Sequence, residues 1–96
     1  MCTLVVRMTL DPARLDEVDR HLEQDVAPWA RRQEGFRTGR WLRSADAKRG
    51  MGVMVFESEQ AARAAAEGPR RYVPVDGRAW NIDEVELFDQ VVAAPE

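Results

Sequence analysis

Aromatic and polar side chains that could bind and activate a small organic molecule are concentrated at a few points of the chain. Tyr72, Trp80 and Asn81 stand close together in the sequence, near Arg71. Small-molecule pockets are mostly apolar and aromatic, with a few polar groups that orient the ligand. We therefore expect a pocket between helices and sheet, with Tyr72 and Asn81 as candidate catalytic residues. Its predicted ligand-binding residues are Trp29, Trp41, Met54, Tyr72 and Trp80, joined by Met8 and by Phe56 or Phe88.

The same tryptophans also have a purely structural interpretation. Large aromatic side chains usually dominate the packing of a core or an interface. They could therefore fill the core and the seam of a dimer. A continuous cavity with Tyr72 or Asn81 directed into it would favour ligand binding, and a cavity filled by side chains would favour the structural alternative.

His21 is the only histidine, and on a helix its neighbours one turn away are Glu17 and Asp25. A carboxylate beside an imidazole could make the pair a catalytic base, or a metal or haem ligand. His21 is therefore the third candidate catalytic residue. On a helical wheel, however, it lies about 100° from the apolar stripe, which predicts an exposed, charge-paired side chain.

Several other chemistries find no support in the sequence. Cys2 is the only cysteine, so no intrachain disulfide can form and no second thiol stands at metal-ligand spacing. Gly50 and Gly52 lack the third glycine of a dinucleotide-binding loop, and they open a strand instead of joining a strand to a helix. We expect no metal ion and no cofactor, with haem as the alternative.

The composition is that of an ordinary globular chain. Its 96 residues predict a single domain, residues 1–96, with a core small enough that oligomerisation would add useful burial. Hydrophobic residues make up 45% and charged residues 32%, and the formal charge of -3 argues against nucleic acid or an anionic membrane as a partner. The sequence shows no signal segment and no apolar run of about 18 residues, so we expect a cytoplasmic protein.

Hydrophobic periodicity predicts the first elements of the fold. Residues 2–10 alternate as a strand with one buried face does, and its apolar members are Leu4, Val6, Met8 and Leu10. Asp11 and Pro12 then have the residue types of an N-cap and a first helical position. They predict a helix that reaches residues 28–32, where Pro28 kinks or ends it. Its apolar stripe consists of Leu15, Val18, Leu22, Val26 and Trp29.

Residues 36–44 and 50–57 predict a β-hairpin. The first strand is polar, as an edge strand is, with Phe36 and Thr38 expected on one face and Trp41 on the other. The second is apolar on both faces, which is typical of a strand covered twice. A turn near Asp46 and Ala47 would place Trp41 opposite Gly52. The sequence leaves open which set of side chains faces the helices: Gly52, Met54 and Phe56, or Met51, Val53 and Val55.

The last elements complete a familiar order. Ser58 caps a predicted helix over residues 59–67, and Gly68 and Pro69 are expected to end it. A loop over residues 70–79 could form a rim or lid, and a last strand is expected over residues 80–93. The series strand, helix, strand, strand, helix, strand predicts the α+β, ferredoxin-like fold, a four-stranded antiparallel sheet with two helices on one face. Because the other face is apolar yet interrupted by Arg7, we expect a homodimer that buries it.

Four segments of the sequence resemble the dimeric α/β-barrel superfamily, especially its antibiotic-biosynthesis-monooxygenase-like branch. They are Gly35-Phe36, Trp41-Leu42-Arg43-Ser44, residues 53–62 and Val85-Glu86-Leu87-Phe88. The resemblance covers almost the whole chain and implies the strand order 4-1-3-2, with two sheets joined into one barrel. It also implies oxidation of small hydrophobic or aromatic compounds without flavin or metal, in which Asn, Trp, Tyr and Arg side chains bind the substrate and stabilise a carbanion. The alternative is a non-catalytic ligand-binding or stress-associated dimer.

The charges differ between the two expected edge strands. Residues 31–49 carry seven basic side chains against two acidic ones, an excess of five positive charges. Residues 81–96 carry Asp83, Glu84, Glu86, Asp89 and Glu96 and no basic side chain. We expect strand 36–44 of one subunit to approach strand 80–93 of the other, since complementary charge favours that pairing over contact between like edges. Alternatively, the arginines are merely solvated.

Overall fold

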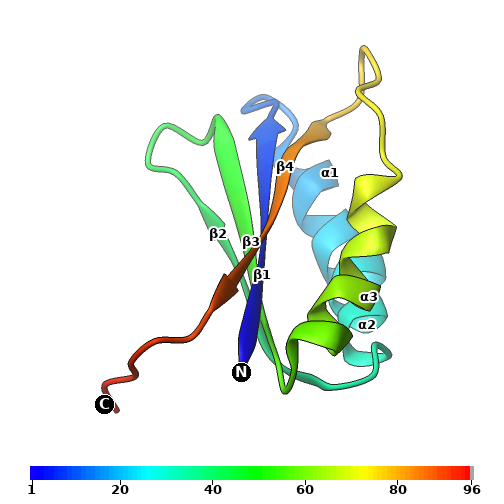
Figure 1. The fold of residues 1–96 in the computed structure, drawn as a ribbon. Coiled ribbons are helices and arrows are strands. Elements are labelled where there is room, and N and C mark those ends of the chain that lie inside the picture. The colour runs from blue at the N-terminus through cyan, green and yellow to red at the C-terminus, as the bar shows by residue number, and fades with distance from the viewer. Residues whose placement is uncertain (96) are drawn as a thin grey trace.

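The computed structural model describes residues 1–95, in which one face of an antiparallel sheet is covered by helices (Figure 1). The sheet has four strands in the order β2-β3-β1-β4. This arrangement confirms the ferredoxin-like α+β fold and the strand order expected from the sequence. The elements are β1 (Cys2–Leu10), α1 (Leu15–His21), η1 (Leu22–Val26), α2 (Ala27–Arg31), β2 (Phe36–Arg43), β3 (Arg49–Phe56), α3 (Glu59–Arg70) and β4 (Trp80–Asp89).

The core lies between the helices and the face of the sheet formed by alternate residues of β1 and β3. Leu4 and Phe56 are fully buried there, and Met54 is 2% exposed. The face of β3 that the sequence left open is therefore settled: Gly52, Met54 and Phe56 meet the helices, while Val53 and its alternates face away. Small side chains on α3 let this helix lie close to the sheet, and the buried ones are Ala62, Ala65 and Ala66.

The first helix begins later than its sequence signals suggest, and it ends within the predicted range of residues 28–32. It starts at Leu15, because the Asp11 carboxylate accepts a hydrogen bond from the backbone N–H of Ala13 (3.0 Å) in a separate turn. It then continues past Pro28 to Arg31. A proline lacks the N–H of a regular helical bond and crowds the preceding turn. The wider π-helical turn η1 directly before α2 accommodates this change without ending the helix.

The predicted end of α3 at Gly68 and Pro69 is wrong, since the helix includes both residues and runs to Arg70. Gly68 has another role: a Cβ atom at this position would lie 3.0 Å from Cζ2 of Trp29. The glycine therefore permits close approach between two helices. The predicted start is confirmed, because Ser58 Oγ accepts a hydrogen bond from the backbone N–H of Ala61 (3.1 Å).

Two irregularities change which residues share a face of the sheet. Trp41 pairs with Gly52 as expected, but a shift in register between Phe36 and Thr38 moves Phe36 to the face of Trp41. A second shift, opposite Arg7 and Met8 of β1, brings Trp80 and Ile82 to the helix-covered face along with Val85 and Leu87. Strand β4 ends at Asp89, earlier than the predicted residue 93.

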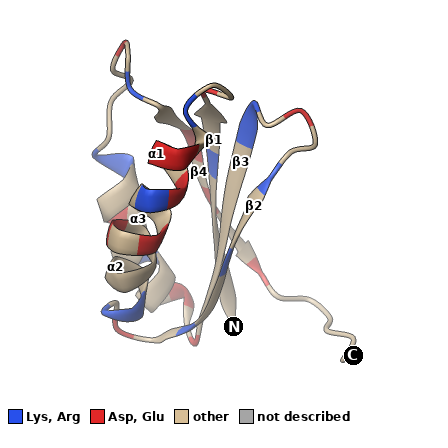
Figure 2. Ribbon diagram, turned by 180° about the vertical axis from the view of Figure 1, so that it is seen from behind, with Lys and Arg blue, Asp and Glu red and all other residues tan. Residues whose placement is uncertain are grey.

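The face of the sheet without helices is partly apolar. Val53 lies across from Val5 at its centre, and Leu42 and Phe88 are 53% and 46% exposed. Arg7 interrupts it, with its Nε atom 3.0 Å from Glu86 and 4.0 Å from Glu84 on β4. Figure 2 shows basic segments on the β2–β3 hairpin. None of the helices in residues 1–95 has the length and apolarity needed to cross a membrane.

Candidate functional site

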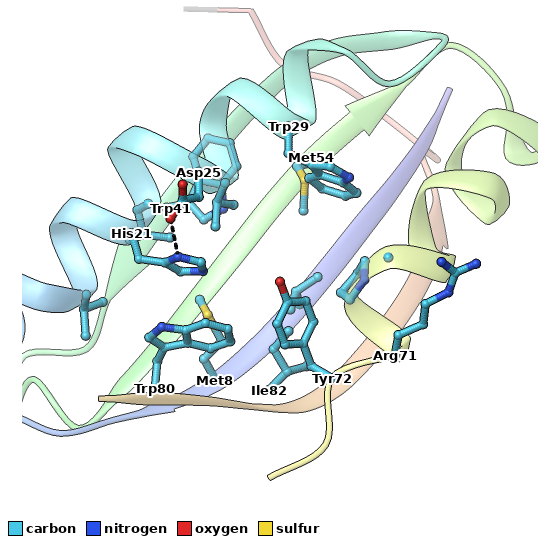
Figure 3. Close-up of a pocket in the computed structure, with 16 residues that line it drawn as sticks. Met8, His21, Asp25, Trp29, Trp41, Met54, Arg71, Tyr72, Trp80 and Ile82 are labelled. Carbon is cyan, nitrogen blue, oxygen red and sulfur yellow. Dashed lines mark hydrogen bonds and ion pairs between the residues drawn. The ribbon is translucent and has the colours of Figure 1, made fainter. Parts of the chain in front are cut away.

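A cavity of about 520 Å³ lies between the sheet, the first helix and the end of α3. Its wall is mostly apolar, and β1, β3 and β4 form its floor. The structure brings all five predicted ligand-binding residues to this one cavity, although they come from five different elements or loops (Figure 3). They are Trp29, Trp41, Met54, Tyr72 and Trp80.

His21 also lines the cavity, so the predicted exposed position is wrong. Its ring stacks on Trp80, with 4.4 Å between ring centroids and 11° between planes, and its side chain is only 23% exposed. The helical wheel placed His21 relative to its own helix alone. The register shift in β4 turns Trp80 toward the helices, and this indole covers the imidazole.

The second half of the prediction for His21, a carboxylate partner, is present. Nδ1 of His21 lies 3.0 Å from Oδ2 of Asp25, one turn further along the helix. With an ionised Asp25, this geometry assigns the proton of a neutral imidazole to Nδ1 and leaves the lone pair on Nε2. Among residues 1–95, Nε2 has no hydrogen-bond partner. The pair therefore has the arrangement of an oriented general base on the wall of an apolar cavity.

Asn81 does not line the cavity, unlike Tyr72. Its side-chain oxygen accepts hydrogen bonds from the backbone N–H of Val75 (3.0 Å) and from Nη2 of Arg78 (2.9 Å). Asn81 follows Trp80 in β4, and alternate residues of a strand point to opposite faces. The polar cluster recognised in the sequence is thus divided: Tyr72 and Arg71 stand at the cavity, and Asn81 holds the loop.

Arg78 joins this loop to the aromatic wall. Its guanidinium lies 4.4 Å from the Trp80 ring and donates to the backbone oxygens of Trp80 (2.9 Å) and Val73 (2.8 Å). Tyr72 meets Trp80 edge to face, with centroids 5.2 Å apart. The loop over residues 71–79 is therefore tied to β4 beside the cavity, and its residue Tyr72, 46% exposed, forms part of the rim.

Three glycines stand directly against two of the three tryptophans of the cavity wall, Trp29 and Trp41. A Cβ atom would lie 2.8 Å from Cη2 of Trp41 at Gly39, 2.9 Å from Nε1 of Trp41 at Gly52, and 3.0 Å from Cζ2 of Trp29 at Gly68. Each indole thus rests almost on the backbone. The sequence indicated only the contact between Trp41 and Gly52. The contact of Trp29 with Gly68 joins residues that are distant along the chain, whereas Gly39 lies two residues before Trp41 on the same strand.

The sequence also misassigned some members of the wall. Phe56 lies in the core, and Phe88 lies on the opposite, open face of the sheet. Asp25 and Ile82 do line the cavity but were not predicted as ligand contacts. The signal for Asp25 was its position one helical turn from the only histidine. The orientation of Ile82 depends on a bulge in β4, which the alternation of residues in a single strand does not reveal.

Two further kinds of site, a metal-ligand cluster and a reactive thiol, are not found within residues 1–95. No three His, Cys, Asp or Glu side chains of this part of the chain come together as a metal-ligand group. Cys2 is buried in the core, and burial, with Asp89 and Glu59 nearby, raises the pKa of its thiol. A thiol that resists ionisation is a poor nucleophile.

Comparison with known proteins identifies the fold. No protein-family model and no curated protein matches the sequence. The solved structure of the heme-degrader MhuD from Mycobacterium tuberculosis, with two hemes bound, has a TM-score of 0.75 at 16% identity, covering 99% of this chain and 100% of that chain. SnoaB from Streptomyces nogalater, a cofactor-independent oxygenase, has a TM-score of 0.65 at 24% identity, covering 99% and 97%.

A monooxygenase from the gene ActVA-Orf6 of Streptomyces coelicolor, in complex with nanaomycin D, has a TM-score of 0.66 at 21% identity, covering 99% of this chain and 92% of that chain. A structure from Bordetella bronchiseptica described as an antibiotic biosynthesis monooxygenase has a TM-score of 0.68 at 18% identity, covering 95% and 97%. These similarities extend over nearly every element of the chain, which has the ferredoxin-like fold of the antibiotic-biosynthesis-monooxygenase-like proteins.

Proposed function

We propose that the protein binds a planar, hydroxylated aromatic compound and oxidises it with O₂ as a cofactor-independent monooxygenase. The observation that carries this proposal is the pair of His21 and Asp25 on the wall of an aromatic cavity of about 520 Å³. The shared fold with a cofactor-independent oxygenase and with a monooxygenase in complex with nanaomycin D supports the same activity. Flat aromatic walls favour a flat ligand, because offset stacking and edge contacts add to simple burial.

In the proposed reaction, Nε2 of His21 removes a proton from the substrate, and Asp25 stabilises the imidazolium that forms. The electron-rich substrate anion then reduces O₂, and a C–O bond forms at an activated CH₂ group. Loss of water leaves a carbonyl, so one oxygen atom enters the product and the other leaves as water. The CH₂ group supplies the four electrons and two hydrogens required, and no external reductant is consumed. The indoles of Trp29 and Trp80 orient the ring and exclude water.

The direct test is oxygen uptake with anthrone, corrected for uncatalysed oxidation. We expect consumption of one O₂ per anthrone, with anthraquinone as the product and no need for flavin or metal. Binding is measured separately under anaerobic conditions, by quenching of tryptophan fluorescence. Absence of both turnover and binding would refute the enzyme and the ligand site together.

A non-catalytic ligand-binding protein is the alternative, and the same two measurements separate it from the oxygenase. Quenching by the aromatic compound without enzyme-dependent oxygen uptake would assign a binding function to the cavity. The tying of the loop at residues 71–79 by Asn81 and Arg78 suits either function, because both require a formed rim.

Haem is the second candidate ligand, because the imidazole Nε2 of His21 on the cavity wall is the nitrogen donor that would hold its iron. Arg71, also at the cavity, is the residue that would pair with a propionate group. When bound, haem would supply iron chemistry for O₂ activation. Oxygen uptake is therefore measured with and without added haem, and a Soret band that His21→Gln abolishes would establish this ligand.

We also propose that the protein forms a homodimer through the open face of the sheet. Val5, Val53 and Leu42 lie on this face, which no helix of residues 1–95 covers. Part of the edge charge is used within the chain: Arg43 pairs with Asp19, and Arg37 lies 3.8 Å from Glu57. The remaining charge on β2 and β4 is opposite in sign, which favours contact between β2 of one subunit and β4 of the other.

For the dimer, the informative substitution is Val53→Asp at the centre of the open face. A buried, unpaired carboxylate is costly, so we expect the variant to sediment as a folded monomer at micromolar concentration, where the wild-type protein sediments as a dimer. Ala64→Glu, on the exposed side of α3, is the matched control and leaves the sedimentation coefficient unchanged. A monomeric wild-type protein would contradict the proposal.

A further inference from the structure

We infer that Gly39, Gly52 and Gly68 determine the size of the aromatic compound that the cavity accepts. This inference rests on the proposed function and concerns the upper size limit of its aromatic substrates. None of the three glycines offers a side chain to a ligand. Each instead sets the position of an indole that forms the wall.

Trp41 lies across two neighbouring strands, and each strand has a glycine beneath it. Its Cη2 atom would be 2.8 Å from a Cβ at Gly39 on β2, and its Nε1 atom 2.9 Å from a Cβ at Gly52 on β3. Contacts below about 3 Å are not tolerated in a packed interior, so an added methyl group must displace something. Strand β3 is paired on both sides, with β2 and with β1, and cannot easily yield. The indole is the part that moves, away from the sheet and into the cavity that it borders.

Trp29 is placed in the same way from the opposite wall. Gly68 belongs to α3, and its missing side chain leaves space for the benzo ring of Trp29, 3.0 Å from the position of a Cβ atom. The helix backbone at Gly68 is held by the packing of Ala65 and Ala66 against the sheet. A side chain at this position therefore also narrows the cavity. Glycines on the sheet and on α3 thus widen the same cavity, in each case by letting an indole lie close to the backbone.

Width is the property that separates polycyclic from smaller aromatic ligands. A single methylene in an apolar pocket changes discrimination by about 10-fold to 200-fold. The cavity of about 520 Å³ depends on both indoles lying flat against the backbone. Narrowing it should disfavour a three-ring compound much more than a two-ring compound, while His21 and Asp25 remain in place.

The experiment compares the Kd of 2-hydroxyanthraquinone with that of 2-naphthol, measured by tryptophan fluorescence quenching on Gly52→Ala and, independently, Gly68→Ala. We expect each substitution to shift the ratio of the two Kd values by at least about 10-fold against the three-ring ligand. The control is Ala64→Glu on the exposed side of α3. Ala64 does not line the cavity, so the ratio stays at the wild-type value.

Replacing the displaced indole by a smaller ring tests whether its displacement causes the change in the Kd ratio. Trp41→Phe combined with Gly52→Ala should restore three-ring binding relative to Gly52→Ala alone, and Trp29→Phe should do the same for Gly68→Ala. An unchanged Kd ratio in both glycine variants, with wild-type binding intact, would overturn the inference and leave the proposed function standing. Absence of binding of either compound by the wild-type protein would instead refute the proposed function.

Discussion

His21→Gln is expected to reduce the rate of substrate-dependent oxygen uptake by about 10²-fold to 10⁴-fold, the range contributed by a positioned general base. Glutamine has no group that accepts a proton at neutral pH. Its amide still fills part of the space beside Trp80, which the imidazole contacts at 4.4 Å. We therefore expect the anaerobic Kd of the aromatic ligand to change only a few-fold, so that the loss appears in kcat.

Asp25→Asn separates the role of the carboxylate from that of the ring. The amide can still contact Nδ1 of His21, at 3.0 Å in the wild-type geometry, but it carries no charge to stabilise the imidazolium. Loss of the carboxylate partner of a metal-bound histidine typically costs about 10-fold to 100-fold, and we expect a loss of this order here. Single-turnover rates measured after mixing with O₂ report this step without interference from product release.

Glu17→Gln is the matched control for both substitutions. Sequence spacing alone makes Glu17 as good a partner for His21 as Asp25 is. In the structure, however, its carboxylate lies 2.6 Å from Nη2 of Arg14. We expect wild-type kinetics for this variant. Wild-type kcat in His21→Gln would contradict the proposed base, and equal losses in the Glu17 and Asp25 variants would point to a general effect of helix charge.

The contrast between Glu17 and Asp25 shows which features of the structure sequence periodicity can predict and which it cannot. Alternation in residues 2–10 correctly identified the buried face of β1, because one face of that strand is strongly apolar and the other is not. The helical wheel also placed Val18 correctly in the core. Such patterns describe one element relative to its own axis. They contain no information about a side chain such as Trp80 that arrives from another element and covers His21.

Bulges and close contacts between elements could not be predicted from the sequence for a related reason. A single extra residue in β4 reverses the alternation between Ile82 and Val85, and local sequence does not mark where it occurs. Gly68 resembles a helix terminator until Trp29 is seen against it. The residues of the cavity could thus be named in large part from their type, while the features that give it width could not.

The face of β3 that meets the helices decides whether the cavity exists, and Phe56→Ala tests this assignment by its effect on stability. Phe56 is fully buried and packs edge to face on Phe36, with centroids 5.9 Å apart. Truncation of a buried phenylalanine costs about 3–5 kcal/mol, a large share of the 5–15 kcal/mol that stabilises a typical domain. We expect a loss of this size in the free energy of unfolding measured with urea.

Phe88→Ala is the matched comparison, since it removes the same side chain from the open face, where Phe88 is 46% exposed. Both substitutions are made on the Val53→Asp background, so that dissociation of a dimer does not enter either measurement. A side chain that stays half in water gives up little burial when truncated, and we expect a loss of about 1 kcal/mol or less. Equal losses would mean that both faces of the sheet are covered within one chain. In that case the open face would not be available to a second subunit, and the proposed dimer interface would be wrong.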